Sequence, residues 1–172
     1  MADSCPLCGF TDRSVSPADA AVALRSLPRR YRGILVRPED EQEGDNPVTR
    51  PGASGWSAVA HAAYAVDAID RADEALRATL VHDRPSVVVP AVDPPAPAPA
   101  GPPASVLDGL KAVTDAMAST IENAHGEEWL RPAQAADGTA VTAIDLARRA
   151  VHAGVHHLRL AESVLREVVG RP

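Results

Sequence analysis

Apolar residues recur every three or four positions along four stretches of the chain, and this periodicity predicts four amphipathic α-helices. The third stretch follows a proline-rich segment, and we expect Ser105 to cap the start of its helix. The four predicted helices cover approximately residues 17–36, 57–81, 105–124 and 142–168.

The residues that flank two of these stretches support the predicted ends. Ser16 is followed by a proline and then by Asp19, which is a common sequence at a helix start. Thr142 and Asp145 have the spacing of a capping box, in which two side chains satisfy free backbone amides. Gly170 is expected to end the last helix, because glycine adopts the left-handed conformation found after many helices.

Two long connections separate the predicted helices. Residues 37–55 are first acidic and then rich in proline and glycine, and half of residues 90–103 are proline. The second composition favours an extended polyproline II segment, either as a stiff connection or as a lid or partner-docking strand. We therefore predict an all-α four-helix bundle over residues 17–172, with long crossover loops. Residues 1–16 form a separate N-terminal segment in this prediction.

The composition and charge of the chain argue against some classes of function. The 172 residues suggest a single domain, and the net charge of -6 argues against non-specific binding to nucleic acid. Aromatic residues make up only 3% of the chain, so alanine, valine and leucine should form the helix contacts. There is no secretory signal and no apolar run long enough for a membrane span, so we expect a cytoplasmic protein.

The two cysteines, Cys5 and Cys8, form the motif "CPLCGF" near the start of the chain. A CxxC turn is half of many zinc sites and the whole of many redox pairs. A redox role requires a βαβ context, which does not follow here. We expect a turn without catalytic function, and the alternative is a zinc knuckle completed by a histidine or by a partner chain.

The fourth predicted helix carries a continuous polar stripe. Its members follow each other at intervals of four and three residues, which places them on one helix face. They are Asp145, Arg149, His152, His156, Arg159 and Ser163. His157 lies about 100° around the helix from His156 and need not share its role.

The second predicted helix offers further polar groups. Tyr64, Asp67 and Arg71 share one face, with His61 about 60° to the side, and Trp56 immediately precedes the helix. If this helix faces the fourth one, five acid–base or metal-binding side chains converge. They are His61, Tyr64, Asp67, His152 and His156.

These motifs, in this order, resemble the DinB-like superfamily, and in particular its actinobacterial branch. That branch is related to the mycothiol-dependent maleylpyruvate isomerases and thiol S-transferases. The resemblance covers nearly the whole chain and rests on the order and spacing of its motifs. The matching positions are Cys5 to Phe10, Trp56, Ser57, Asp67, Trp129, Asp137, Gly138, Thr142, His152, His156 and His157.

The resemblance implies a bundle that holds a metal ion on three histidines. Two of them are His152 and His156, and the third position, eight residues after Trp56, is Tyr64 in this chain. His61 lies one turn earlier and is the available substitute. A phenol with a pKa near 10 is a poor zinc ligand, so we expect no metal cofactor. The alternative is zinc or nickel acting with mycothiol, with His61 completing the site.

The sequence therefore predicts a small-molecule tailoring enzyme that works without a metal. We expect elimination, cyclisation or group transfer on a small, polar, anionic metabolite, in natural-product biosynthesis by analogy with other reused scaffolds. Catalytic groups would be His152, His156, His61, Tyr64 and Asp67, and substrate-binding groups would be Arg149, Arg159, Arg71, Asp45 and Trp56. The alternatives are a metal-dependent thiol S-transferase or isomerase of the mycothiol type, and a non-catalytic accessory subunit. A homodimer, or a heteromer with a related bundle protein, fits each of these.

Overall fold

The computed structural model describes residues 4–11, 14–36, 46–94, 96–97 and 100–170. These residues contain four α-helices, which confirms the predicted all-α class and the approximate helix boundaries. None of the described helices is both long and apolar enough to cross a membrane. The helices are α1 (Pro17–Leu35), α2 (Ala58–Val81), α3 (Pro103–Asn123) and α4 (Ala143–Val169).

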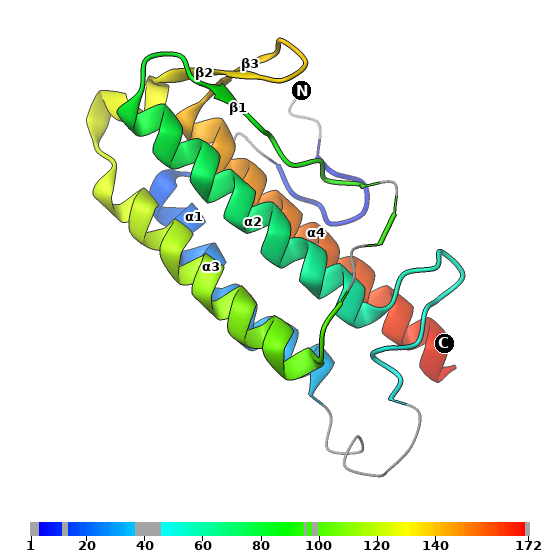
Figure 1. The fold of residues 1–172 in the computed structure, drawn as a ribbon. Coiled ribbons are helices and arrows are strands. Elements are labelled where there is room, and N and C mark those ends of the chain that lie inside the picture. Colours follow the sequence, from blue (N-terminus) through cyan, green and yellow to red (C-terminus); the bar gives the residue numbers. More distant parts are fainter. Residues whose placement is uncertain (1–3, 12–13, 37–45, 95, 98–99, 171–172) are drawn as a thin grey trace.

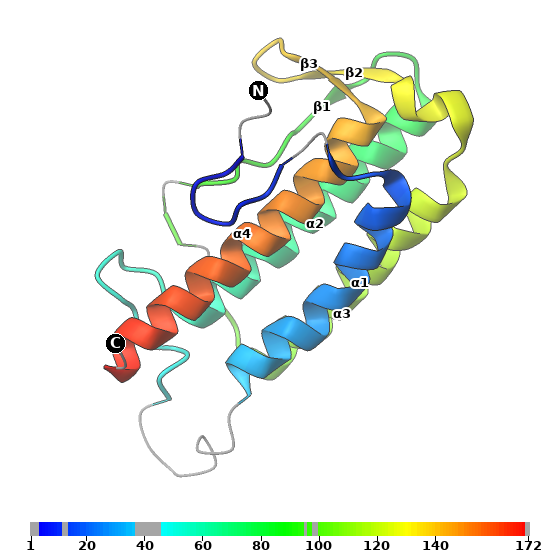
Figure 2. The same ribbon diagram turned by 180° about the vertical axis from the view of Figure 1, so that it is seen from behind.

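The four helices form a bundle in which α2 lies beside α4 and α1 lies beside α3 (Figures 1 and 2). Helices α1 and α4 run in one direction, and α2 and α3 run in the other (Figure 1). Because α2 and α3 are parallel, the chain between them must return along the outside of the bundle. Part of this return segment passes over α2 and α4, and the N-terminal segment lies on the same side (Figures 1 and 2).

The helix ends follow the capping signals in the sequence, with one exception. Ser16 and Asp19 form a capping box, as do Thr142 and Asp145, and Gly170 ends α4 at a φ of 68°. The prediction that Ser105 caps α3 was wrong, because the helix begins earlier, at Pro103. Proline is well suited to the first turn of a helix, since its φ is already helical and no amide partner is needed there.

Small and branched side chains fill the core between the helices, as the composition predicts. Most alanines on α2 and α4 are buried, which lets these two helices pack closely. The largest fully buried apolar side chains come from all four helices: Leu24, Leu27, Tyr31, Leu35, Ile69, Leu76, Leu110, Met117, Leu146 and Leu158.

A small three-stranded sheet closes one end of the bundle and was not predicted. Strand β1 (Ser86–Val87) pairs in parallel with β2 (Pro132–Ala135), which pairs antiparallel with β3 (Ala140–Thr142). A short 3-10 helix, η3 (Gly126–Leu130), precedes β2. Strands of this length carry too few residues for an alternating pattern. The sheet ties the end of α2 to the start of α4 and so fixes where the return segment begins.

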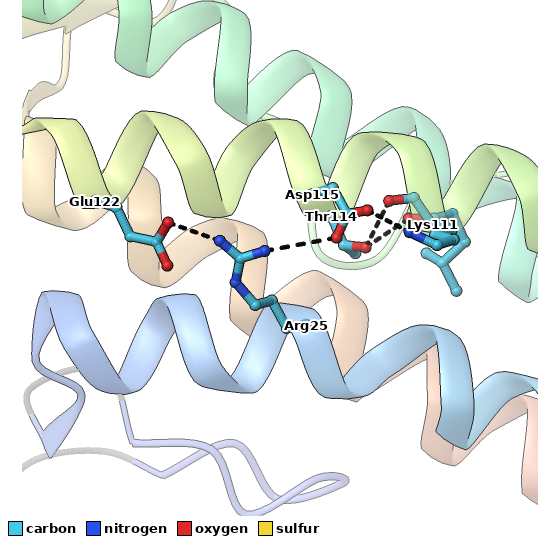
Figure 3. Close-up of polar contacts among 6 residues, drawn as sticks. Arg25, Lys111, Thr114, Asp115 and Glu122 are labelled. Atoms are coloured by element: carbon cyan, nitrogen blue, oxygen red, sulfur yellow. Dashed lines mark hydrogen bonds and ion pairs between the residues drawn. The ribbon is translucent and has the colours of Figure 1, made fainter.

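Charged side chains link α1 to α3 on the outer surface (Figure 3). The guanidinium of Arg25 donates to Glu122 at 2.6 Å and lies 3.8 Å from a carboxylate oxygen of Asp115. All three side chains are more than two-fifths exposed, so these ion pairs add little to the stability of the bundle.

Candidate functional site

Two consecutive histidines of α4 belong to two different, neighbouring sites. His156 and His157 are both almost completely buried, at 1% exposure. Their side chains leave the helix about 100° apart, so they face different surroundings. His156 belongs to a cluster of cysteine and histidine side chains, and His157 belongs to a cavity between α2 and α4.

The first place is a cluster of two cysteines and two histidines. Cys5 and Cys8 come from the N-terminal segment, and His152 and His156 come from successive turns of α4. One potential ligand atom from each residue lies within 4.8 Å of the other three. Within the cluster, Cys5 Sγ lies 3.4 Å from His156 Nδ1. Sequence reasoning left open which histidine could complete the CxxC motif, and the fold brings both members of the HxxxH pair to it.

The local fold of the N-terminal segment presents both thiols to α4. The Gly9 amide donates to the Cys5 carbonyl at 2.8 Å, and the Cys5 amide donates to the Phe10 carbonyl at 2.8 Å. Gly9 has a φ of 71°, which a residue with a side chain rarely adopts. The Phe10 ring then stacks on His152, with centroids 4.8 Å apart and planes 20° apart.

The two thiols have opposite pKa shifts. Burial acts to raise the pKa of Cys5, but hydrogen bonding with the Cys8 amide, the His152 side chain, the Leu7 amide and the His156 side chain outweighs burial and lowers the pKa to about 6. Burial raises the pKa of Cys8 to about 11, and the neighbouring Cys5 contributes to the same shift.

The second place is a pair of imidazoles that meet across the interface of α2 and α4. His61 Nδ1 and His157 Nδ1 are 3.0 Å apart, and His157 Nε2 is 2.8 Å from the Val92 carbonyl oxygen. A carbonyl only accepts, so the neutral His157 carries its proton on Nε2 and accepts at Nδ1. His61 must then donate from Nδ1, which leaves the lone pair of His61 on Nε2.

Aromatic rings enclose this pair. Trp56 stacks on His61 with centroids 4.7 Å apart and planes 16° apart, and the Tyr64 ring lies 4.6 Å from that of His157. Burial is the main cause that lowers the pKa of His61 to about 3 and that of His157 to about 4. Both imidazoles are therefore neutral at physiological pH. Burial also raises the pKa of Tyr64, whose hydroxyl donates to the Ala91 carbonyl at 2.6 Å.

A cavity of about 410 Å³ opens beside the histidine pair. Its polar lining includes His61, His157, Asp93, Ser163 and Glu167, and Trp56 forms part of the apolar wall. No lysine or arginine is among the residues that line it in the described part of the chain. The cavity therefore has an acidic character and the size of a small-molecule site.

The proline-rich segment forms one wall of this cavity, and sequence analysis missed the contacts it makes. Ala91 accepts from Tyr64, and Val92 accepts from His157. Asp93 Oδ1 is 2.9 Å from His156 Nε2, and the same residue lines the cavity. Asp93 thus connects the cluster and the cavity. It is the only charged residue between positions 90 and 103. This isolated charge was the one feature of the sequence that could have marked Asp93 as a candidate site residue.

Asp67 and Arg71 belong neither to the cysteine–histidine cluster nor to the lining of the cavity, although the charge of Asp67 helps to raise the pKa of Tyr64. They form an ion pair of 2.9 Å on the surface of α2, with both side chains about half exposed. They line a separate hollow of about 430 Å³ together with Asp70, Glu74 and Ser86. The expected convergence of five polar side chains therefore differs from the observed arrangement, in which Asp67 is separate and the histidines divide into two groups.

The other predicted substrate-binding residues are dispersed. Arg159 is half exposed and pairs with Glu162 at 2.9 Å. Arg149 is partly buried, and its charge is close enough to Tyr64 to act against the rise in the pKa of that phenol. Trp56 lies in the wall of the histidine cavity. Asp45 lies outside the described residues.

The ligand set implied by the family resemblance does not assemble. Tyr64 is bonded to the Ala91 carbonyl and lies against His157, while His61 is paired with His157. His152 and His156 instead face the cysteines. Within the part of the chain that the structure describes, the only group of at least three close histidine, cysteine or acidic ligands is Cys5, Cys8, His152 and His156. Its two sulfur and two nitrogen donors suit a tetrahedral cation.

Comparison with known proteins supports the fold. No protein-family model matches the sequence, and a search of curated proteins found no match. Among solved structures, the chain is similar to YfiT from Bacillus subtilis, described as a probable metal-dependent hydrolase with an unusual four-helix bundle topology. The similarity has a TM-score of 0.72 at 14% identity and covers 91% of this chain and 90% of the other. It confirms the predicted all-α four-helix bundle.

Proposed function

We propose that the protein is a small-molecule enzyme that carries out group transfer or elimination in the cavity between α2 and α4. The observation that carries this proposal is the 3.0 Å contact between His61 and His157 in the wall of a cavity of about 410 Å³. Two buried imidazoles joined to each other and to a backbone carbonyl form a relay with a fixed direction.

In this proposal His61 accepts a proton from the substrate at Nε2. The proton on His61 Nδ1 points to His157, and the Val92 carbonyl holds His157 in the matching tautomer. This arrangement keeps both rings oriented, as the third member of a catalytic triad orients a histidine base. Trp56 stacks on His61 and the Tyr64 ring lies against His157, so both imidazoles are restricted in orientation.

The lining favours a polar substrate that is uncharged or positively charged. Asp93 and Glu167 supply carboxylates, and Ser163 supplies a hydroxyl. This choice differs from the anionic metabolite expected from the sequence, because Arg71 and Arg159 are engaged with carboxylates elsewhere. A hydroxyl or amine on the substrate would donate to the carboxylates while an acidic proton faces His61.

A metal-dependent reaction is the second candidate. The solved structure to which the chain is similar is described as a probable metal-dependent hydrolase, and four potential ligands converge at the first cluster. In that case activity would depend on Cys5 and Cys8 and on added metal, whereas the first candidate depends on His61 and His157. Thiol transfer of the mycothiol type belongs to this second candidate.

Activated substrates test the proposal without knowledge of the natural one. Tag-free protein would be assayed with 4-nitrophenyl acetate and with small compounds that carry a β-leaving group. We expect turnover above buffer, and a fall of about 100-fold or more in kcat/KM for His61→Asn, within the range typical of acid–base groups. The matched control is His125→Asn, whose histidine is exposed at the far end of α3.

Two results would contradict the proposal. One is a His61→Asn variant that folds normally and is as active as the wild type. The other is activity that survives His61→Asn and His157→Asn but is abolished by a chelator, which would favour the metal-dependent candidate. Thermal melting of each variant separates loss of activity from loss of folding.

A further inference from the structure

The cysteine–histidine cluster carries an inference that is independent of the reaction in the cavity. We propose that Cys5, Cys8, His152 and His156 bind one zinc ion in a closed, structural site. One ligand atom from each residue lies within 4.8 Å of the others, and Cys5 Sγ is 3.4 Å from His156 Nδ1. Zinc–sulfur and zinc–nitrogen bonds of about 2.3 and 2.0–2.1 Å place tetrahedral ligand atoms roughly 3.3–3.8 Å apart. Modest side-chain movements therefore bring all four atoms to bonding distance.

The four ligands come in two pairs, and the local backbone structure holds each pair in position. His152 and His156 are one turn apart on α4, so their side chains project from the same face of the helix. Cys5 and Cys8 occupy a tight turn closed by the amides of Cys5 and Gly9. Each pair is held by its own local structure. Binding therefore orders few additional side chains, and the ion would join two segments that are more than 140 residues apart in the sequence.

Neighbouring groups orient the histidines for a cation. His156 Nε2 is 2.9 Å from the Asp93 carboxylate, which can only accept, so the proton of His156 lies on Nε2. Its Nδ1 then presents a lone pair towards Cys5. A carboxylate behind a metal-binding histidine is a frequent feature of zinc sites and strengthens the ligand. Phe10 stacks on His152 and restricts the second imidazole.

The two sulfur and two nitrogen ligand atoms indicate which ion binds and what it does. Thiolates favour zinc, copper(I) and iron–sulfur clusters over magnesium or calcium, and two sulfurs with two imidazoles in a tetrahedron are typical of zinc. Four protein ligands leave no position for water or substrate, so the ion is structural. It holds the N-terminal segment against α4 and, through Asp93, fixes the wall of the neighbouring cavity.

Metal analysis of tag-free, reduced protein tests this site directly. Zinc per chain would be measured by mass spectrometry for the wild type, for Cys5→Ser with Cys8→Ser, and for the surface control His125→Ala. We expect about one zinc per chain in the wild type and the control, and less than a tenth of that in the double variant. Cobalt(II) titrated into the metal-free wild type should give the visible bands of a tetrahedral site and a thiolate charge-transfer band.

Other results would overturn the proposal. They are the absence of bound zinc even after zinc is added to reduced protein, zinc that survives the loss of both thiols, and a Cys5–Cys8 disulfide that forms in the presence of zinc. If the double variant does not fold, Asp93→Asn keeps all four ligands. We expect it to weaken zinc binding about 10–100-fold, in the range found for such supporting groups. An unchanged zinc affinity in Asp93→Asn would contradict the proposal that the Asp93 carboxylate supports His156 as a ligand.

Discussion

Tyr31 of α1 donates a hydrogen bond from its hydroxyl to the backbone carbonyl of Gly154 in α4, at 2.9 Å, in the centre of the bundle. Tyr31 is fully buried, and burial raises its pKa well above the ordinary value, so the hydroxyl stays protonated and donates. The bond links two parallel helices at the level of the histidines. Gly154 lies midway between His152 and His156 in the sequence.

Replacing Tyr31 with phenylalanine tests this link. Tyr31→Phe keeps the ring and removes the hydroxyl, and the Gly154 carbonyl loses its partner from α1. We expect a loss of about 0.5–1.5 kcal/mol in the free energy of unfolding, which is the net value of one such hydrogen bond. Urea unfolding followed by circular dichroism would measure it. A variant as stable as the wild type would contradict this account.

Gly154→Ala should destabilise the protein although alanine favours helices. An added Cβ would clash with Leu27 Cδ1 and lie 3.5 Å from Ile69 Cδ1, and both of these side chains are fully buried. Overpacking of this kind costs about 1–3 kcal/mol, whereas the gain in helix propensity is about 1 kcal/mol or less. The matched control is Gly33→Ala in the exposed face of α1, where a Cβ meets nothing within 4 Å. The control substitution should stabilise the protein by about 0.5–1 kcal/mol. Thermal melting of both variants would show whether their stabilities change in opposite directions.

Much of the fold could be predicted from the sequence because its determinants are local. Helical periodicity placed all four helices, and the capping residues Ser16, Thr142 and Gly170 have the expected conformations. The small sheet could not be predicted, because its strands are two to four residues long and β1 pairs with β2 across more than 40 positions. Its existence depends on tertiary packing.

The candidate site was harder to predict, because its contacts cross between distant segments. Periodicity placed His156 and His157 on different faces of α4, but it could not say what each face meets. The convergence of Cys5 with His156 joins residues 151 positions apart. Asp93 lies in a proline-rich segment whose composition suggests only a connection, and its contact with His156 depends on the path of that segment outside the bundle.

The capping box at the start of α1 predicts a dependence of stability on pH. Hydrogen bonds from the Ser16 hydroxyl and then from the Ser16 amide lower the pKa of Asp19 below its ordinary value of 3.8. A carboxyl with a lowered pKa in the folded state contributes stability above the unfolded pKa and loses it as the pH falls through the folded value. Asp19→Asn should therefore melt below the wild type at neutral pH, and the gap should close in acid. A gap that grows in acid would contradict the assignment.

The ion pairs that Arg25 makes across α1 and α3 should contribute little (Figure 3). The side chains of Arg25 and Glu122 are about half exposed, so solvent and salt screen their attraction. We expect Glu122→Gln to reduce the free energy of unfolding only slightly, and we expect the difference to vanish in roughly 1 M sodium chloride. Paired denaturation curves at low and high salt provide the measurement. A loss that persists at high salt would mean that packing, and not charge, makes the contribution.

The hydroxyl of Tyr64 should control how firmly the proline-rich segment is held over the cavity. Burial raises the pKa of Tyr64, so the phenol is protonated at neutral pH and donates to the Ala91 carbonyl at 2.6 Å. Tyr64→Phe keeps the ring against His157 but releases Ala91, while the Val92 and Asp93 contacts to α4 remain. We expect faster amide hydrogen exchange in residues 87–93, with little change inside α2. Tyr31→Phe is the matched control, since it removes a buried tyrosine hydroxyl on α1 and leaves this segment bonded. Equal exchange in residues 87–93 for Tyr64→Phe and the wild type would mean that the two histidine contacts hold the segment by themselves.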